Sequence, residues 1–256
     1  VSSSNEGGEV RTNVTTTFTT DTVSSIKIDS RNESVSWEFD GNTSGFTREI
    51  YFQNAFESKW GGSGGLWSVY GPGALQDRDH DIRLSGTSIY SNLGWNQSID
   101  APNLNLNDSS PHHVILTQGE KNGTRLYIDG NLVASQSYTS LYGNTFTWAN
   151  TEEIGYGENT GLFTGEILRY RYWDEEAETS EITESGVLLN NPYHDIAIRD
   201  GILSNKGSSG TKIQSQGNIH GSSDATIKTP YISAPTYSIT PTASSSNEGG
   251  EVRTNV

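Results

Sequence analysis

The 256-residue sequence contains no cysteine and no methionine. Without cysteine it has no disulfide scaffold, no thiolate metal site and no thiol nucleophile. Stability must therefore come from packing of β-strands, from bound ions or from neighbouring molecules. The absence of methionine, including an initiator, favours a segment of a larger or processed polypeptide.

Basic residues are also scarce, since 16 Lys and Arg stand against 31 Asp and Glu, for a net charge of −15. This acidity would repel phosphate over most of the surface, so we expect no nucleic-acid partner. The sequence has no run of 18 apolar residues and no leader-like start, so we expect no membrane insertion and no signal peptide in this segment. A hydrophobic content of 31% is nevertheless enough for a packed core.

A 13-residue string, SSSNEGGEVRTNV, occurs twice, at residues 2–14 and 244–256, with an offset of 244 − 2 = 242 residues. Such identity does not arise by chance, and it predicts one period of a tandem array plus the start of the next copy. An artefact that carries one boundary segment at both ends is the alternative. The predicted organisation is a starting edge or connector (1–30), a main domain (31–190), a Gly/Ser/Pro-rich β connector (191–243) and the next copy (244–256).

Apolar residues alternate, or form short runs, between clusters of Gly, Asn, Asp and Ser, which predicts an all-β fold. Asp129-Gly130 predicts a two-residue hairpin turn, because both positions need positive φ. Residues 175–185, acidic and anchored by Ile182, predict a short helix. From about residue 201, Gly- and Ser-rich sequence predicts thin strands or a semi-ordered connector. The predicted strands are 10–19, 23–28, 34–39, 47–52, 65–70, 81–84, 87–91, 113–118, 125–128, 131–137, 152–155 and 161–173.

Two long stretches carry a family resemblance. Residues 112–135, HHVILTQGEKNGTRLYIDGNLVAS, and residues 154–182, IGYGENTGLFTGEILRYRYWDEEAETSEI, are similar to the laminin-G-like or pentraxin-like branch of the concanavalin A-like jelly rolls. Residues 34–41, SVSWEFDG, resemble the opening strand of that family, and residues 46–52, FTREIYF, the strand that follows. The resemblance implies a concanavalin A-like antiparallel jelly-roll sandwich.

The termini carry a second resemblance. The string PTYSITPTASSSNEGGEVRTNV, residues 235–256, is similar to the first strands of Ig-like and Calx-beta-like surface repeats. In such repeats a Glu-Gly-Gly turn, found here at residues 6–8 and 248–250, separates an edge strand from a Thr/Val strand. This implies a small Ig-like or extended β connector.

An acidic motif is the strongest candidate for a metal site. Asp77, Asp79 and Asp81 alternate, so their carboxylates share one side of an extended segment, and Ca²⁺ favours such oxygen ligands. The alternative is a solvated loop in which Arg78 tempers the repulsion. The jelly-roll resemblance implies Ca²⁺ at a loop rim, and no other cofactor is expected. The residues that could converge there are Asp77, Asp79, Glu158, Asn159 and Asp174.

Catalytic motifs are missing from the sequence. Jelly-roll glucanases present an E-x-D-x-x-E strand, which does not occur here. The adjacent Glu152 and Glu153 point to opposite faces of a strand, and His112 and His113 accompany no nucleophile or zinc motif. We therefore expect no enzyme.

Aromatic residues in Gly- and Asn-rich stretches are candidates for sugar binding, because sugars stack on aromatic rings. The same rings could instead contact neighbouring subunits. Trp37 and Trp173 are expected in the core, where most Trp of such a sandwich pack. The candidate loop aromatics are Trp60, Trp67, Tyr70, Trp95, Tyr142, Trp148 and Tyr156.

Six Asn-X-Ser/Thr sequons are candidate glycosylation sites and indicate exposed loops. In a chain rich in Asn, Ser and Thr, some of them are expected from composition alone. They lie at Asn13, Asn32, Asn42, Asn96, Asn107 and Asn122.

Two functions remain open. The first is a structural repeat of an extracellular filament, fibre or giant surface adhesin, joined to identical neighbouring repeats through its terminal strands. The second is a carbohydrate-binding, lectin-like adhesion module, also conceivable in a phage tail fibre, with surface glycans as partners. Both predict an extracellular location, on a cell-surface appendage or a virion surface.

Overall fold

The computed structural model describes the backbone of residues 10–13, 16–30, 32–39, 45–53, 64–70, 80–85, 87–93, 98–106, 108–137, 151–157, 161–232 and 236–239. The chain divides by its contacts into a main unit, Phe18–Tyr231, and a terminal unit formed by Val1–Thr17 and Ile232–Val256. None of the described helices is long and apolar enough to cross a membrane.

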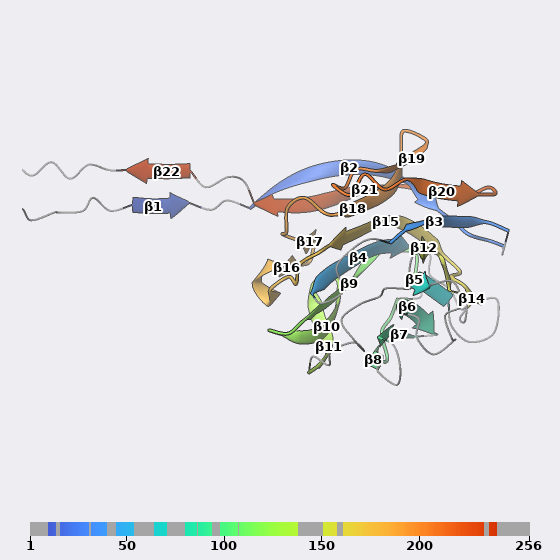
Figure 1. Ribbon diagram of the computed structural model, residues 1–256, viewed down its shortest axis with the longest axis horizontal. Helices are drawn as coiled ribbons and strands as arrows, with labels where there is room; N and C mark the ends of the chain where they lie inside the picture. Colours follow the sequence, from blue (N-terminus) through green and yellow to red (C-terminus); the bar gives the residue numbers. More distant parts are fainter. Residues whose placement is uncertain are drawn as a thin grey trace, which may run out of the picture. The chain divides into compact units, whose positions relative to one another are not determined.

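The first sheet of the main unit has the strand order β11-β10-β9-β4-β15-β18-β2-β21, with β19 paired to β18 (Figure 1). Its described pairings are antiparallel, such as those of β4 with β9 and with β15. The strands are β2 (Thr16–Ile26), β4 (Phe46–Gln53), β9 (His112–Gly119), β10 (Gly123–Ile128), β11 (Asn131–Gln136), β15 (Glu166–Trp173), β18 (His194–Arg199), β19 (Ile202–Asn205) and β21 (His220–Ile232).

The second sheet has the order β20-β3-β12-β5-β6-β7-β8, and the short strands β13 and β14 pair beside β5. Two further two-stranded sheets consist of β16 with β17 and of β1 with β22. The second-sheet strands are β3 (Ser34–Glu38), β5 (Gly64–Tyr70), β6 (His80–Ser85), β7 (Ser88–Leu93), β8 (Ser98–Ala101), β12 (Thr151–Ile154), β13 (Tyr156–Gly157), β14 (Gly161–Leu162) and β20 (Ile213–Gln216). The small sheets comprise β16 (Ile182–Thr183), β17 (Gly186–Val187), β1 (Val10–Asn13) and β22 (Thr236–Ile239).

The two large sheets bury one shared core. Phe46, Ile50 and Tyr170 of the first sheet belong to the same apolar cluster as Trp37 and Ile82 of the second. Along strands such as β3, β6 and β9, alternate residues enter this cluster, as the period of two in a β-strand requires. The prediction of an all-β antiparallel jelly-roll sandwich is therefore confirmed, with a single parallel contact, between β14 and β5, among the described strand pairings.

A charged pair lies inside this core. The Arg48 guanidinium and the Glu152 carboxylate are 3.2 Å apart, with side chains 2% and 0% exposed. The Nε1 of Trp37 donates to Glu152 at 2.6 Å, and the Tyr170 hydroxyl donates to it at 3.2 Å. Burial raises the pKa of Glu152, although the charge of Arg48 opposes this. Glu152 is therefore a structural group of the core, out of reach of a ligand on the surface.

His194 gives the core a pH dependence. Burial lowers its pKa from 6.5 to about 4, so the folded protein holds it neutral. The unfolded chain binds a proton below pH 6.5, so the free energy of unfolding should fall as the pH drops from 6.5 to 4. The fall should total roughly 3 kcal/mol, at about 1.4 kcal/mol per pKa unit. His194→Gln should flatten this part of the profile in urea unfolding between about pH 4 and pH 8; parallel profiles would assign the acid sensitivity to another group.

The helix predicted for residues 175–185 is wrong. That segment forms a 3₁₀ helix of three residues, Thr179–Glu181, followed by the β16–β17 hairpin. Side chains of the first sheet compete with helical hydrogen bonds here: the Ala177 N–H donates to the Thr47 hydroxyl, which donates to the Glu175 carbonyl, each at 2.8 Å. Burial of Ala177 and Ile182 against the sheet then fixes the segment.

The connector predicted for residues 191–243 also needs correction. Strands β18, β19, β20 and β21 belong to the two large sheets, so the main unit extends to Tyr231. By contrast, the predicted Asp129-Gly130 turn is confirmed, with φ of 48° and 78° joining β10 to β11. Of the repeated string, residues 10–13 form β1, and residues 2–9, 14 and 244–256 lie outside the described residues.

Candidate functional site

The outer face of the first sheet is covered by the chain itself. Ile115, Tyr127 and Trp173, which point away from the main core, pack against Ala177 and Val187 of the segment that follows β15. A second apolar group on this side of the sheet contains Val23, Tyr51, Leu168, Ala197 and Ile227. This face is therefore filled by packing that the protein supplies itself.

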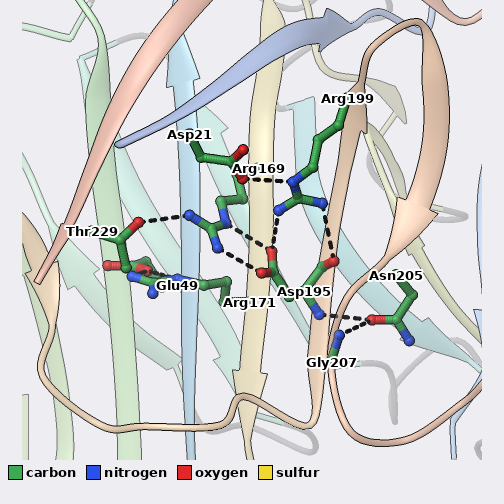
Figure 2. Close-up of polar contacts among 9 residues, drawn as sticks. All are labelled: Asp21, Glu49, Arg169, Arg171, Asp195, Arg199, Asn205, Gly207 and Thr229. Carbon is green, nitrogen blue, oxygen red and sulfur yellow. Dashed lines mark hydrogen bonds and ion pairs between the residues drawn. The ribbon is translucent and has the colours of Figure 1, made fainter. Parts of the chain in front are cut away.

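An ionic network also lies on this side of the first sheet (Figure 2). The Asp195 carboxylate accepts hydrogen bonds from Nε and Nη2 of Arg169 at 2.7 and 2.6 Å, and from Nη2 of Arg199 at 2.7 Å. Arg199 Nε also donates to Asp21 at 2.6 Å, and Arg169 Nη1 to Thr229 at 2.7 Å. Burial alone would raise the pKa of Asp195, but the two guanidinium groups hold it below its usual value.

The network continues to Glu49, which accepts from Arg171 Nε at 2.5 Å and from the Val187 N–H at 3.1 Å. Each of its three guanidinium groups thus faces a carboxylate of the same chain. We interpret the network as structural, because its charges are matched within the chain and its three guanidinium groups are buried.

The outer face of the second sheet is different in character. Ile82 and Leu84 of β6 and Ile89 of β7 lie in the core. Because side chains alternate along a strand, Asp81, Arg83 and Tyr90 point to the other side. This face is polar and carries an aromatic ring.

Arg83 and Tyr90 form a pair on this face. Arg83 Nη1 donates to the Tyr90 hydroxyl at 3.2 Å, and its Cζ lies 5.3 Å from the centroid of the ring. Asp81 forms an ion pair with Arg83. Burial would lower the pKa of Arg83, but these partners raise it, so the guanidinium keeps its charge. The cation is therefore held in a fixed position beside the ring.

Glu153 shares this face, because its neighbour Glu152 points into the core. The register pairs Glu153 with Ser68 and Ser68 with Asp81, so the two carboxylates are two strands apart, about 10 Å at ~4.8 Å per strand. Both are buried, Glu153 to 3% and Asp81 to 2% exposure, although neither faces the core.

Six strand termini meet at one end of the second sheet, which we name the loop end. The register aligns the last residues of β3, β5 and β7 with the first residues of β12, β6 and β8. Segments 71–79 and 94–97 begin and end at this end of the sheet. Segment 40–44 begins near it, and segment 138–150 ends at it. The termini that define the loop end are Glu38, Tyr70, His80, Leu93, Ser98 and Thr151.

Five of the candidate metal and aromatic residues belong to segments of the chain that begin or end at the loop end. Asp77, Asp79, Trp95, Tyr142 and Trp148 lie outside the described residues, but their segments begin or end there. Trp60, Glu158 and Asn159 also lie outside the described residues, in segments that adjoin the opposite end of β5 and the end of β13.

The remaining metal candidates lie near the same end. Asp174 follows β15 directly and is exposed, and the Tyr172 ring is 5.9 Å from that of Phe39, the residue after β3. Asp81 is one residue from the loop end but is already paired with Arg83. Within the part of the chain that the structure describes, no three His, Asp or Glu side chains are grouped to hold a metal ion.

The aromatic candidates inside the described strands do not all reach the surface. Trp67 is 1% exposed and packs in the core, with its ring 4.1 Å from Arg48 Cζ, so the prediction of a surface ring is wrong for this residue. It enters the core because β5 carries a bulge between Gly65 and Trp67, which changes the residue that faces inward. Tyr70 and Tyr156 belong to β5 and β13.

The two adjacent histidines serve local structure. His112 lies between Asp129 and Asp108, at 2.8 and 3.1 Å, and these hydrogen bonds, led by that of Asp129, raise its pKa. His113 is buried with its Nδ1 3.9 Å from Glu49, and burial lowers its pKa. Within the described part of the chain, neither imidazole forms a hydrogen bond with a Ser or Thr that could act as a nucleophile.

Two sequons can be compared by their surroundings. Asn32 is exposed beside β3, whereas the amide of Asn122 is half-buried and donates to Glu178 at 3.1 Å. Asn13 belongs to β1. Asn42, Asn96 and Asn107 lie outside the described residues.

The Arg83–Tyr90 pair escaped the sequence analysis. Apolar and polar residues alternate in HDIRLS and SIYSNL, and this pattern already separates Ile82, Leu84 and Ile89 from their polar neighbours. What the sequence did not supply is the register of β6 on β7, which places Arg83 opposite Tyr90.

Comparison with known proteins shows similarity at the level of structure alone. No protein-family model matches the sequence, and no curated protein matches it significantly. The CBM40 carbohydrate-binding module of the Ruminococcus gnavus IT-sialidase, solved with bound α2,3-sialyllactose, aligns with a TM-score of 0.50 and 17% identity, over 63% of this chain and 95% of the module.

Two further structures are similar. A putative carbohydrate-binding protein from Bacteroides ovatus has a TM-score of 0.52 and 14% identity, over 78% of this chain and 62% of that protein. A heptameric SAP-like pentraxin from Limulus polyphemus has a TM-score of 0.49 and 13% identity, over 78% of this chain and 95% of the pentraxin. At such identities the first two show the class of fold alone, an all-β jelly roll.

Proposed function

We propose that the chain is a carbohydrate-binding adhesion module, and that its ligand lies on the outer face of the second sheet at the loop end. One observation carries this proposal: Tyr90 and Arg83 form a fixed pair on the polar outer face of the second sheet. That face thus presents an aromatic ring beside hydrogen-bonding groups.

The described side chains suit a sugar chemically. A sugar stacks its apolar face on an aromatic ring and exchanges hydrogen bonds around its rim. Tyr90 offers a ring and a hydroxyl, and Arg83 offers N–H donors. Fixed partners reduce the side-chain entropy lost on binding, because Arg83 is already oriented by Asp81 and Tyr90.

The jelly-roll fold supports the proposal as an analogy, since carbohydrate-binding modules share it. We propose a binding function without catalysis, because Glu152 is enclosed by the core and Asp81 is paired with Arg83. The same proposal includes three further predictions. They are a Ca²⁺ ion at Asp77, Asp79 and Asp174, a laminin-G-like relationship and an extracellular location.

The ligand can be identified with a glycan array probed by the whole 256-residue chain, with and without EDTA. For the best glycan, Tyr90→Ala should weaken binding by roughly 10-fold in calorimetry, the equivalent of about 1.4 kcal/mol. Phe18→Ala is the matched control, because Phe18 is an aromatic residue 55% exposed on β2 of the first sheet. Equal affinities of the Tyr90 and Phe18 variants would place the site elsewhere, and loss of binding in EDTA would support the Ca²⁺ prediction.

A second function is compatible with the first. The exact recurrence of residues 2–14 at 244–256 favours a structural repeat of an extracellular fibre or adhesin, in which identical neighbours are the partners. Repetition would also make weak sugar sites effective through multivalency.

A further inference from the structure

The charges on the outer face of the second sheet are unevenly matched. Strands β12, β5, β6, β7 and β8 contain a single Lys or Arg, which is Arg83. Their outward positions also hold three carboxylates, those of Asp81, Glu153 and Asp100, because the residues on either side of each lie toward the core. Counted as ionised, these four groups sum to 1 − 3 = −2.

Asp100 lies next to the Arg83–Tyr90 pair. The register sets Asp100 of β8 opposite Tyr90 of β7, and Tyr90 opposite Arg83 of β6. Side chains directly opposite each other on one face have Cβ atoms about 5 Å apart. Asp100 is exposed and Tyr90 is half-buried. A ligand that stacks on the Tyr90 ring therefore meets an exposed carboxylate within a Debye length, about 8 Å at physiological salt.

The positive charge of Arg83 is already matched. Its Nη1 donates to the Tyr90 hydroxyl and its Nη2 pairs with Asp81. Its Nε is buried without a hydrogen-bond partner among the described residues. A carboxylate is bound best by two parallel N–H groups of a guanidinium that has no other counter-ion. An acidic ligand at Arg83 would have to share this one cation with Asp81.

The segments that begin or end at the loop end do not reverse this balance. Their sequences contain one basic residue, Arg78, and three acidic residues, Asp40, Asp77 and Asp79. Their formal charge is therefore 1 − 3 = −2. A Ca²⁺ ion at Asp77 and Asp79 would reduce it, so the selectivity of the protein itself is best measured without the ion.

We propose that the sugar site selects uncharged glycans and excludes acidic ones, which carry a carboxylate or a sulfate. This inference rests on the carbohydrate-binding function proposed above and adds the chemical class of the ligand. An acidic sugar brings a negative charge to a face with three carboxylates and one guanidinium. The hydroxyls of a neutral sugar can donate to carboxylates and accept from Arg83, so they suit both kinds of group. Repulsion of the wrong ligand then supplies the specificity.

A glycan array probed by the whole 256-residue chain in EDTA tests the selectivity. Each neutral glycan would be printed beside a sialylated and a sulfated form of the same core. The glycans bound best should be uncharged, and their acidic forms should bind at least about 10-fold more weakly at physiological salt. The difference should narrow in 1 M salt, where the Debye length is about 3 Å.

The array separates failure of this inference from failure of the proposed function. Acidic forms bound as tightly as their neutral cores, or more tightly, would overturn the selectivity and leave carbohydrate binding in place. A folded chain that binds no glycan would overturn both.

Asp100→Lys tests whether this face causes the selectivity. Asp100 is exposed, so the variant should fold, and the balance of the four groups becomes 2 − 2 = 0. Acidic forms should then gain roughly 10-fold relative to their neutral cores in calorimetry. Asp224→Lys is the matched control, because Asp224 is exposed on β21 of the first sheet and the change in net charge is the same. An equal gain in both variants, or none in Asp100→Lys, would overturn the proposal.

Discussion

Arg48→Met should lower the free energy of unfolding by about 3–5 kcal/mol, because it leaves Glu152 buried without its counter-ion. The substitution also removes a cation whose Cζ lies 4.1 Å from the rings of Phe46 and Trp67 and 4.7 Å from that of Tyr172. Methionine fills a similar volume, so the loss would report the charge more than a cavity. Urea unfolding followed by Trp fluorescence measures it.

The matched control is Arg125→Met, since Arg125 bonds Thr179 at the protein surface. Surface contacts of this kind contribute about 1 kcal/mol or less. A similar small loss in both variants would mean that the buried pair contributes little beyond packing. Recovery of stability by replacing Glu152 with Gln in the Arg48→Met background would confirm that the uncompensated carboxylate is the cause.

Asp195→Asn should destabilise the protein by about 3 kcal/mol, the second large effect. Asp195 accepts three charge-assisted hydrogen bonds from Arg169 and Arg199, and the neutral amide would leave two buried cations facing each other. The shape of the side chain is nearly unchanged, so packing loss is minimal. Thermal and urea unfolding would both show the change.

Asp200→Asn is the control for this variant. Asp200 is exposed in the turn between β18 and β19, with φ of 52°, a conformation that asparagine tolerates well. Its stability should stay within about 0.5 kcal/mol of the natural protein. If Asp195→Asn were equally mild, the network of Figure 2 would not hold the outer face of the first sheet.

The sequence predicted the sandwich because its central strands bury residues with a period of two or on both faces. β4, β9 and β15 are buried along almost their whole length. In the sequence they appear as continuous strand-like runs, such as HHVILTQ and EILRYRYW. The same reasoning failed for β20 and β21. β20 is exposed at three of four positions, and most of β21 buries few side chains, so edge strands of this kind carry little hydrophobic pattern.

The candidate site was predictable in its residue types and not in its arrangement. Gly- and Asn-rich context indicated loops for Trp95 and Trp148, which lie outside the described residues. Trp67 shared that context but lies in a strand, beside a bulge that turns it inward. Long-range register depends on packing between strands far apart in the chain, which local sequence does not encode.

Hydrogen–deuterium exchange of the whole chain, with and without its best glycan, tests the central claim most directly. The account predicts slower exchange in β6 and β7, around Arg83 and Tyr90, and in the segments anchored at the loop end, with no change in β10 and β11 of the first sheet. Protection confined to the first sheet, or no glycan bound by the folded chain, would contradict it.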